Sequence, residues 1–349
     1  MVKISNLEIS PNSEPIIIAE MSGNHNQSLD RALSIVDSVA NSGAHILKLQ
    51  TYRPDTITLD IEKGDFLINE KESLWYGRSF YSLYKEAHTP WEWQKEIFIK
   101  ANKKGLICFS SVFDASSVHF LEELNVPAYK IASQECIHLP LLREVALTNK
   151  PIVISTGMAS LKEIDEAVNE VRKTSSSSVI LMKCTSSYPA DPANSNIMTI
   201  PFLKKTFGCE VGLSDHTAGI GAALSAVAHG ATLVEKHLTL SRTDGGVDSA
   251  FSLEPHEMKL LVEESKRAWQ SLGSVFFGPT ESEKISLSGR RSIYVCKNIK
   301  KNEIISEENI AVVRPNKGLA PKYYYEILGM SAKCDLEKGT PISLKFLKA

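Results

Sequence analysis

The feature that most constrains the fold is an alternation, repeated along most of the chain, between short apolar runs and longer amphipathic segments. Short runs rich in β-branched residues are typical of strands buried on both faces, and the longer segments are typical of covering helices. Together they form the pattern of parallel βα units. Eight strand-like runs can be identified: 16–20, 45–50, 106–111, 128–133, 152–156, 179–184, 210–215 and 233–239.

Helical patterns follow these runs, for example at residues 29–41, 93–104, 117–124, 161–173, 218–229 and 255–272. Gly43, Gly105 and Gly230 near three of their ends act as C-cap signals. Eight βα units over roughly 270 residues fit a closed (β/α)8 TIM barrel better than an open, doubly wound sheet. The aromatic-rich stretch 51–89 is too long for an ordinary βα loop, so we expect a lid or substrate loop there.

The chain has 349 residues, which favours a large α/β domain followed by a small one. We expect a catalytic barrel over residues 1–275, a linker at 276–285 and a second domain at 286–349. The second domain shows short apolar segments, turns and a weak repeat between residues 298–305 and 335–342, which predicts a small β-rich module. So small a module is marginally stable alone, and we expect it to pack on a barrel.

The composition is that of a folded, soluble protein, with 43% hydrophobic and 23% charged residues. A net charge of -2 argues against a nucleic-acid or anionic-membrane partner held by bulk charge. The six cysteines form no CxxC pair and are interpreted as buried free thiols in a reducing compartment. Because no early apolar run is long enough for a signal peptide or membrane span, we expect a cytoplasmic protein.

Polar residues gather at the carboxyl ends of the strand-like runs, where the active sites of such barrels lie. Lys48 and Lys130 are embedded in apolar runs, where an unpaired ammonium group is costly to bury. Two such lysines beside several hydroxyl groups suit a phosphate and a carboxylate, which phosphoenolpyruvate combines. The alternative for each lysine is an ion pair with a barrel glutamate such as Glu235 or Glu135.

His216 ends the seventh run and His237 lies in the eighth, so adjacent strands about 4.8 Å apart would direct both imidazoles to one point. Neutral imidazoles in that arrangement bind first-row divalent metals, with positions left open for water or substrate. The alternative is two hydrogen-bonded core histidines. His25 and His45 lack such a partner and are expected to be structural. Glu20, at the end of the first run, could serve as a proton shuttle or hydroxyl anchor.

Five separated segments together resemble the sialic acid synthase family. They are residues 19–26 (AEMSGNHN), 48–52 (KLQTY), 129–133 (YKIAS), 212–216 (GLSDH) and 235–237 (EKH). The tail is similar to the family's antifreeze-protein-like (SAF, β-clip) domain. Within the family, residues 74–75 and 88–93 (HTPWEW) are most similar to pseudaminic acid synthases. Gln27, Ser111-Val112 and Ser186 depart from the sialic acid synthase pattern, which puts the identity of the sugar in doubt.

The resemblance implies a metal-dependent transferase that condenses phosphoenolpyruvate with an amino-sugar aldehyde, here 2,4-diacetamido-2,4,6-trideoxy-β-L-altropyranose. It implies a divalent metal, Mn²⁺ first and Mg²⁺ or Co²⁺ as alternatives, on His216 and His237. It also implies a homodimer that exchanges tails, with Arg314 delivered to the partner's active site. Glu20, Lys48 and Lys130 would complete the catalytic set. The implied substrate contacts are Gln50, Ser111, Ser133, Ser186, Tyr188, Ser214, Asp248 and Arg314.

Three other functions remain open. The acceptor sugar could be that of an N-acetylneuraminate or legionaminic acid synthase. A metal-dependent aldolase or sugar-phosphate synthase would share the lysines and histidines but gives no role to Arg314 or the tail. A non-catalytic sugar-binding surface module is the third possibility, and the complete set of lysines and histidines at the strand ends speaks against it.

Overall fold

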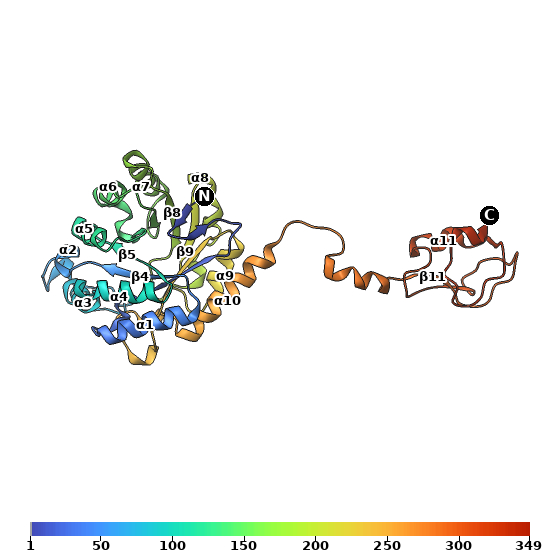
Figure 1. Cartoon of the computed structure of the whole chain (residues 1–349), viewed down its shortest axis with the longest axis horizontal. Coiled ribbons are helices and arrows are strands. Elements are labelled where there is room, and N and C mark those ends of the chain that lie inside the picture. The colour runs from blue at the N-terminus through green and yellow to red at the C-terminus, as the bar shows by residue number, and fades with distance from the viewer. Residues whose placement is uncertain (1) are drawn as a thin grey trace. The chain divides into compact units, whose positions relative to one another are not determined.

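The computed structural model describes residues 2–349, which form two compact units (Figure 1). The first unit ends at Gly273 and the second runs from Ser274 to Ala349. Among the described residues, no helix has both the length and the apolar composition needed to cross a membrane. All six cysteines are free thiols, as predicted. Cys108, Cys136 and Cys184 are buried, but the prediction of burial is wrong for Cys209 and Cys296, which are partly exposed, and for Cys334, which is exposed.

The first unit is a closed barrel of eight parallel strands in chain order, with the last strand paired to the first. The predicted TIM barrel is therefore confirmed. Six of the eight strands differ from the predicted runs only at their ends. The strands are β3 (Ile16–Glu20), β4 (Ile46–Thr51), β5 (Ile107–Val112), β6 (Tyr129–Ile131), β7 (Ile152–Ser155), β8 (Val179–Cys184), β9 (Glu210–Ser214) and β10 (Leu233–His237).

Helices cover the outside of the barrel. Ser28 caps the first of them by accepting a hydrogen bond from the Arg31 N–H, and Gly43 ends it in the left-handed region with φ of 81°. The helices are α1 (Leu29–Ser42), α4 (Trp91–Lys103), α5 (Ala115–Glu123), α6 (Leu139–Leu147), α7 (Leu161–Thr174), α8 (Thr199–Phe207), α9 (Gly221–Ala228) and α10 (Pro255–Leu272).

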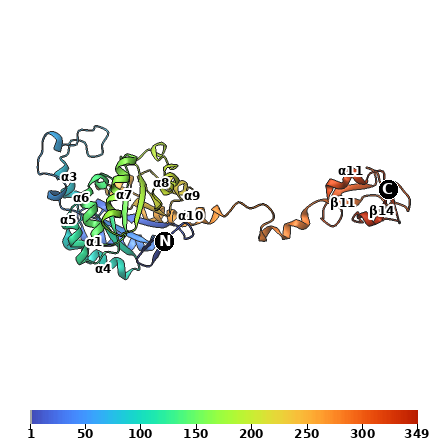
Figure 2. The same ribbon diagram turned by 90° about the horizontal axis from the view of Figure 1, so that it is seen from above.

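The long segment after β4 contains two further short helices, α2 (Pro54–Ile57) and α3 (Phe80–Ala87). Figure 2 shows this segment, in blue, projecting from the body of the barrel. A small apolar cluster of Ile68, Leu83 and Val247 ties it to the loop that follows β10. The segment thus has a fixed contact with a second loop of the barrel mouth.

Alternating side chains give each barrel strand two different faces. Outward residues such as Val234 pack beneath the helices. Inward residues at the amino ends of the strands form an inner apolar layer, and the hairpin of β1 (Val2–Ile4) and β2 (Leu7–Ile9) closes this end with Ile4 and Ile9, which have no exposed surface. Further along each strand the inward positions become polar, so the barrel has a sealed apolar end and a polar mouth.

The second unit has its own core and two short antiparallel pairs, β11 (Ser292–Val295) with β12 (Ile310–Val313) and β13 (Ser331–Ala332) with β14 (Leu347–Lys348). The two copies of the weak sequence repeat lie side by side, because Ile299 and Leu336 exchange two backbone hydrogen bonds of 2.8 Å. The repeat therefore marks two segments that pair with each other inside one small β-rich domain.

Candidate active site at the carboxyl end of the barrel

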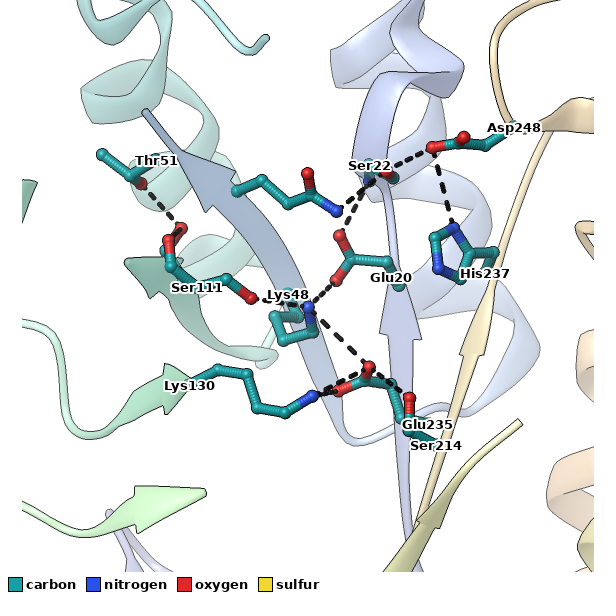
Figure 3. A network of polar contacts seen from close by, with 12 residues as sticks. Glu20, Ser22, Lys48, Thr51, Ser111, Lys130, Ser214, Glu235, His237 and Asp248 are labelled. Carbon is teal, nitrogen blue, oxygen red and sulfur yellow. Dashed lines mark hydrogen bonds and ion pairs between the residues drawn. The ribbon is translucent and has the colours of Figure 1, made fainter. Parts of the chain in front are cut away.

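The strand register arranges the predicted site residues in two neighbouring sets near the carboxyl ends of the strands. Glu20 on β3 is paired with His237 on β10 and with Lys48 on β4. Ser111 on β5 is paired with Lys130 on β6. These five residues alternate with outward-facing neighbours, so their side chains enter the barrel interior, as Figure 3 shows for Glu20, Lys48, Lys130 and His237.

The two inward lysines form a buried cluster with two glutamates (Figure 3). The Lys130 Nζ lies 2.9 and 3.1 Å from the two carboxylate oxygens of Glu235. The Lys48 Nζ forms an ion pair with Glu20, lies 3.8 Å from Glu235, and donates to the Ser111 Oγ at 2.9 Å. Of the two glutamates named from the sequence as alternative partners, Glu235 compensates Lys130, whereas Glu135 forms no ion pair with either lysine among the described residues. Glu20, which was not named as a partner, compensates Lys48.

All four charges of this cluster are buried, and burial opposes the charged form of each. Burial acts to raise the pKa of Glu235, but the ammonium groups of Lys130 and Lys48 outweigh this effect and hold the pKa well below its usual value. Burial raises the pKa of Glu20 and lowers that of Lys130. Burial acts to lower the pKa of Lys48, but the carboxylates of Glu20 and Glu235 outweigh this effect and raise the pKa. Glu235 is therefore a fixed negative charge between two lysines, and Glu20 is the carboxyl group that more readily holds a proton.

A second polar group lies above this cluster and centres on Ser22. The Ser22 hydroxyl donates to Asp248 and accepts a hydrogen bond of 3.0 Å from the Gln50 Nε2, while its backbone N–H donates to Glu20 at 3.2 Å. Ser22 is buried and has a φ of 47°, a conformation that few residues other than glycine adopt. Burial raises the pKa of Asp248. Ser22 therefore links Glu20, Gln50 and Asp248 into one network.

The two predicted metal ligands lie side by side, with ring centroids 5.3 Å apart. The His216 Nδ1 lies 3.0 Å from the Thr185 carbonyl oxygen, a bond that leaves the Nε2 lone pair free in the neutral ring. The His237 Nδ1 is buried without a hydrogen-bond partner, 3.9 Å from the Asp248 carboxylate. Burial and the neighbouring His216 hold the pKa of His237 well below its usual value, which keeps this imidazole neutral.

These observations fit a divalent metal held by two imidazoles. Within residues 2–349, no group of three or more histidine, cysteine, aspartate or glutamate side chains is arranged to hold a metal ion. The protein would then supply only two nitrogen ligands, and water or substrate oxygens would complete the coordination.

Ser133 and Ser186 converge on the backbone of Gly157, which follows β7. The Ser133 Oγ accepts a hydrogen bond of 3.2 Å from the Gly157 N–H. A Cβ at Gly157 would lie 2.4 Å from the Ser186 Oγ and 2.7 Å from the Ser133 Oγ, so only glycine leaves both hydroxyls in place. Two hydroxyls and a backbone N–H at one point form a corner suited to an anion. Ser214, on the neighbouring side, donates to Glu235 at 3.0 Å.

Aromatic rings line the mouth next to the histidines. The Tyr188 ring centroid lies 4.4 Å from that of His216, 5.1 Å from Phe251 and 5.8 Å from Trp75. The Trp75 Nε1 donates a hydrogen bond of 3.0 Å to the Val247 carbonyl. Trp75 thus belongs to the wall of the site, on the segment that was expected to act as a lid.

Trp91 and Trp93, in the segment 88–93 that follows this loop, have packing roles. Trp91 stacks on Phe120 with a centroid distance of 4.6 Å and donates to the Tyr52 carbonyl at 3.1 Å. Trp93 meets the buried ring of His25 edge-on at 5.8 Å. His25 therefore packs apart from the two predicted metal ligands.

A further lysine at the end of a barrel strand faces away from the cluster. Lys183 takes an outward position on β8, and its Nζ donates to the Thr185 hydroxyl at 2.7 Å and to the backbone oxygen of Cys184. Arg314 follows β12 in the second unit and is exposed.

The structure also adds residues that the sequence did not single out. Ser155 ends β7 and has a buried hydroxyl without a partner. Cys184 ends β8, and its Sγ lies 3.8 Å from the Ser186 Oγ and 4.0 Å from the His216 Nδ1. Ser22 and Gly157 complete this group. All four lie at the ends of strand-like runs or in the turns that follow, and that position was the available signal.

Comparison with known proteins gives matches along nearly the whole chain. The model of the NeuB family matches residues 35–276, and that of the SAF domain matches residues 290–348. A pseudaminic acid synthase of Campylobacter jejuni subsp. jejuni (strain 81-176) is 42% identical over 93% of this chain and 94% of its own length. An N,N'-diacetyllegionaminic acid synthase of Campylobacter jejuni subsp. jejuni (strain NCTC 11168) is 35% identical over 91% of this chain and 95% of its own length.

Among solved structures, an N-acetylneuraminic acid (sialic acid) synthetase from Leptospira borgpetersenii in complex with citrate matches with a TM-score of 0.73. It is 32% identical and covers 82% of this chain and 94% of its own. The similarity thus extends from the family model to the three-dimensional fold.

Proposed function

The chain belongs to the NeuB family, and we propose that it is a pseudaminic acid synthase, which condenses phosphoenolpyruvate with 2,4-diacetamido-2,4,6-trideoxy-β-L-altropyranose to give pseudaminic acid and phosphate. The predicted family and the architecture of barrel plus SAF domain are confirmed. One observation carries the proposed chemistry: Lys48 and Lys130 point into the barrel next to His216 and His237. All four lie toward the polar end of the barrel, and apolar side chains seal the other end.

The anionic substrate would bind over the lysine cluster. Lys48 and Lys130 would neutralise its phosphate and carboxylate, while Ser111 and Ser214, already bonded to this cluster, would orient it. The corner at Gly157 supplies the hydroxyls of Ser133 and Ser186 to a phosphate. Because these donors are fixed before the ligand arrives, they stabilise charge without reorganisation.

We expect Gly157→Ala to weaken phosphoenolpyruvate binding about 10- to 100-fold, since the added methyl group displaces two hydroxyls that bond a charged ligand. Ser133 and Ser186 can turn aside, so the variant should fold normally. Titration calorimetry with phosphoenolpyruvate checks this. Gly221→Ala is the matched control, because a Cβ there meets nothing within 4 Å. If both variants bound phosphoenolpyruvate with equal affinity, the corner at Gly157 would not be part of the binding site.

A divalent metal, Mn²⁺ first and Mg²⁺ or Co²⁺ as alternatives, would be held by His216 and His237 and would polarise the aldehyde oxygen of the open-chain sugar. The C3 carbon of phosphoenolpyruvate attacks the aldehyde carbon, water adds at C2, and phosphate leaves from the resulting tetrahedral carbon. Glu20, whose pKa burial raises, would hold or deliver a proton at the new hydroxyl group. Gln50 and Asp248, joined through Ser22, would contact the sugar hydroxyls.

The wall of Trp75, Tyr188 and Phe251 supports a 6-deoxy, diacetamido sugar, because its methyl and acetyl groups need apolar surface. The test is phosphate release from phosphoenolpyruvate with Mn²⁺ and three acceptors: the altrose sugar, its legionaminic-type isomer and N-acetylmannosamine. Selective turnover of the altrose sugar is expected. Turnover of another acceptor would make this a legionaminic or N-acetylneuraminate synthase, and release with none would favour an aldolase or a non-catalytic sugar-binding module.

We also propose a cytoplasmic homodimer with exchanged tails, in which the partner's SAF domain supplies Arg314. The SAF domain carries more lysines and arginines than acidic residues, which suits contact with an anionic ligand, and Arg314 is exposed. Arg314→Ala and His237→Ala should each be inactive alone. Co-expressed, they should recover about a quarter of the wild-type sites, because half the dimers are mixed and each holds one intact site. If no activity were recovered, each SAF domain would supply Arg314 to the barrel of its own chain or to no barrel.

A further inference from the structure

Lys236 has no exposed surface and occupies an unusual place for a charged residue. It lies on β10 between Glu235 and His237, whose side chains enter the barrel, so strand alternation turns Lys236 outward toward the helices. Val234, on the same face, packs in the apolar layer there. An ammonium group in such surroundings is costly unless it is well compensated, and no step of the proposed reaction uses it.

The contacts of Lys236 all lie in one loop. Its Nζ is 2.9 Å from an Asp215 carboxylate oxygen, 2.6 Å from the Thr217 carbonyl oxygen and 2.8 Å from the Gly219 carbonyl oxygen. The other Asp215 oxygen accepts the Thr217 N–H at 2.9 Å. All three N–H donors of the Lys236 ammonium group thus bond to the turn that runs from β9 to α9.

That turn carries His216. Its two neighbours, Asp215 and Thr217, are the residues that Lys236 holds, and the Asp215 N–H donates to the Glu235 carbonyl at 2.9 Å. The turn is therefore fixed to β10 on both sides of His216. The strand that holds it carries His237 as the residue directly after Lys236.

We propose that Lys236 and Asp215 are positioning residues that set the separation and orientation of His216 and His237, and thereby the affinity of the pair for a divalent cation. The inference rests on the proposed metal site. Neither side chain contacts the metal or the substrate. A purely structural ion pair could be replaced by apolar side chains of similar size, but an apolar side chain cannot bond the backbone of residues 215–219.

The test compares Lys236→Met, Asp215→Leu and the double variant with the wild type. Mn²⁺ affinity is measured by titration calorimetry and by the electron paramagnetic resonance signal of free Mn²⁺, and urea unfolding is followed in the presence of a chelator. Each single variant leaves a buried charge unpaired and should unfold at lower urea, whereas the double variant should recover stability. Mn²⁺ binding should be about 10- to 100-fold weaker in all three.

Tyr129→Phe is the matched control for stability. Tyr129 is also fully buried on an outward strand face, and its hydroxyl donates to Glu122, away from the histidines. It should lose stability and keep its Mn²⁺ affinity. A double variant that is stable and binds Mn²⁺ as the wild type does would overturn the inference. A wild type that binds no Mn²⁺, Mg²⁺ or Co²⁺ would instead overturn the metal site itself.

Discussion

Replacing Lys130 with alanine is expected to reduce phosphoenolpyruvate binding below detection and to stop turnover. Lys130 is only 2% exposed, and its ammonium group pairs with Glu235 in the cluster that is proposed to bind the anion. Its loss leaves Lys48, 3.8 Å from Glu235, as the remaining cation of the cluster, so the site would offer one positive charge fewer to an anionic ligand. Calorimetric titration with phosphoenolpyruvate, without sugar, measures the effect directly.

The same variant should be less stable by about 3–5 kcal/mol, because removing one partner leaves a buried charge unpaired. Urea unfolding separates this loss from the loss of binding. Lys150→Ala is the matched control, since the Lys150 Nζ also forms an ion pair, 2.6 Å from Glu122, but lies away from the mouth. A Lys130→Ala protein that binds phosphoenolpyruvate normally would show that the lysine serves only to neutralise Glu235.

His237→Ala is expected to abolish metal binding and to lower turnover at least about a thousandfold, since polarising the aldehyde oxygen contributes several kcal/mol and each 1.4 kcal/mol is a factor of ten. The His237 ring has an unpartnered nitrogen, so its removal breaks no hydrogen bond at Nδ1. The wild type should melt at a higher temperature with Mn²⁺ than with a chelator. The variant should melt at the same temperature in both.

His45→Ala provides the comparison for that experiment. The His45 Nδ1 accepts a hydrogen bond of 3.0 Å from the Ile17 N–H near the other end of the barrel, so this variant should keep its response to Mn²⁺. If His237→Ala were also stabilised by Mn²⁺, or kept its turnover, the two histidines would be packing residues, and the metal would have to be sought elsewhere.

The barrel could be predicted because strands buried on both faces leave continuous apolar runs, which stand out between amphipathic helices. Two helices of the layer that covers the barrel, α6 and α8, were not identified individually, because proline stands in the first turn of both and interrupts the helical pattern. The hairpin of β1 and β2 was missed for a similar reason, because strands of three residues are too short to show a period of two.

The site was predicted residue by residue but not contact by contact. Sequence placed Lys48, Lys130 and both histidines at strand ends, yet left open whether Glu235 pairs with a lysine. That pairing depends on which side chains meet across a closed barrel, and closure and stagger are properties of the whole sheet. The roles of Ser22 and Gly157 could not be predicted, because they come from local backbone geometry. Ser22 has a positive φ, and two serine hydroxyls lie close to the Gly157 backbone.

The hairpin that closes the amino end of the barrel has a consequence for the order of events. Because Ile4 and Ile9 fill that end, substrates would enter this unit and products would leave it at the opposite end. Lys48 precedes Gln50 on β4, so with the binding sites proposed above the anionic substrate would lie deeper than the sugar. The sugar, once bound, would then stand between phosphoenolpyruvate and solvent. The geometry therefore favours a compulsory sequence in which phosphoenolpyruvate enters first and the sugar second.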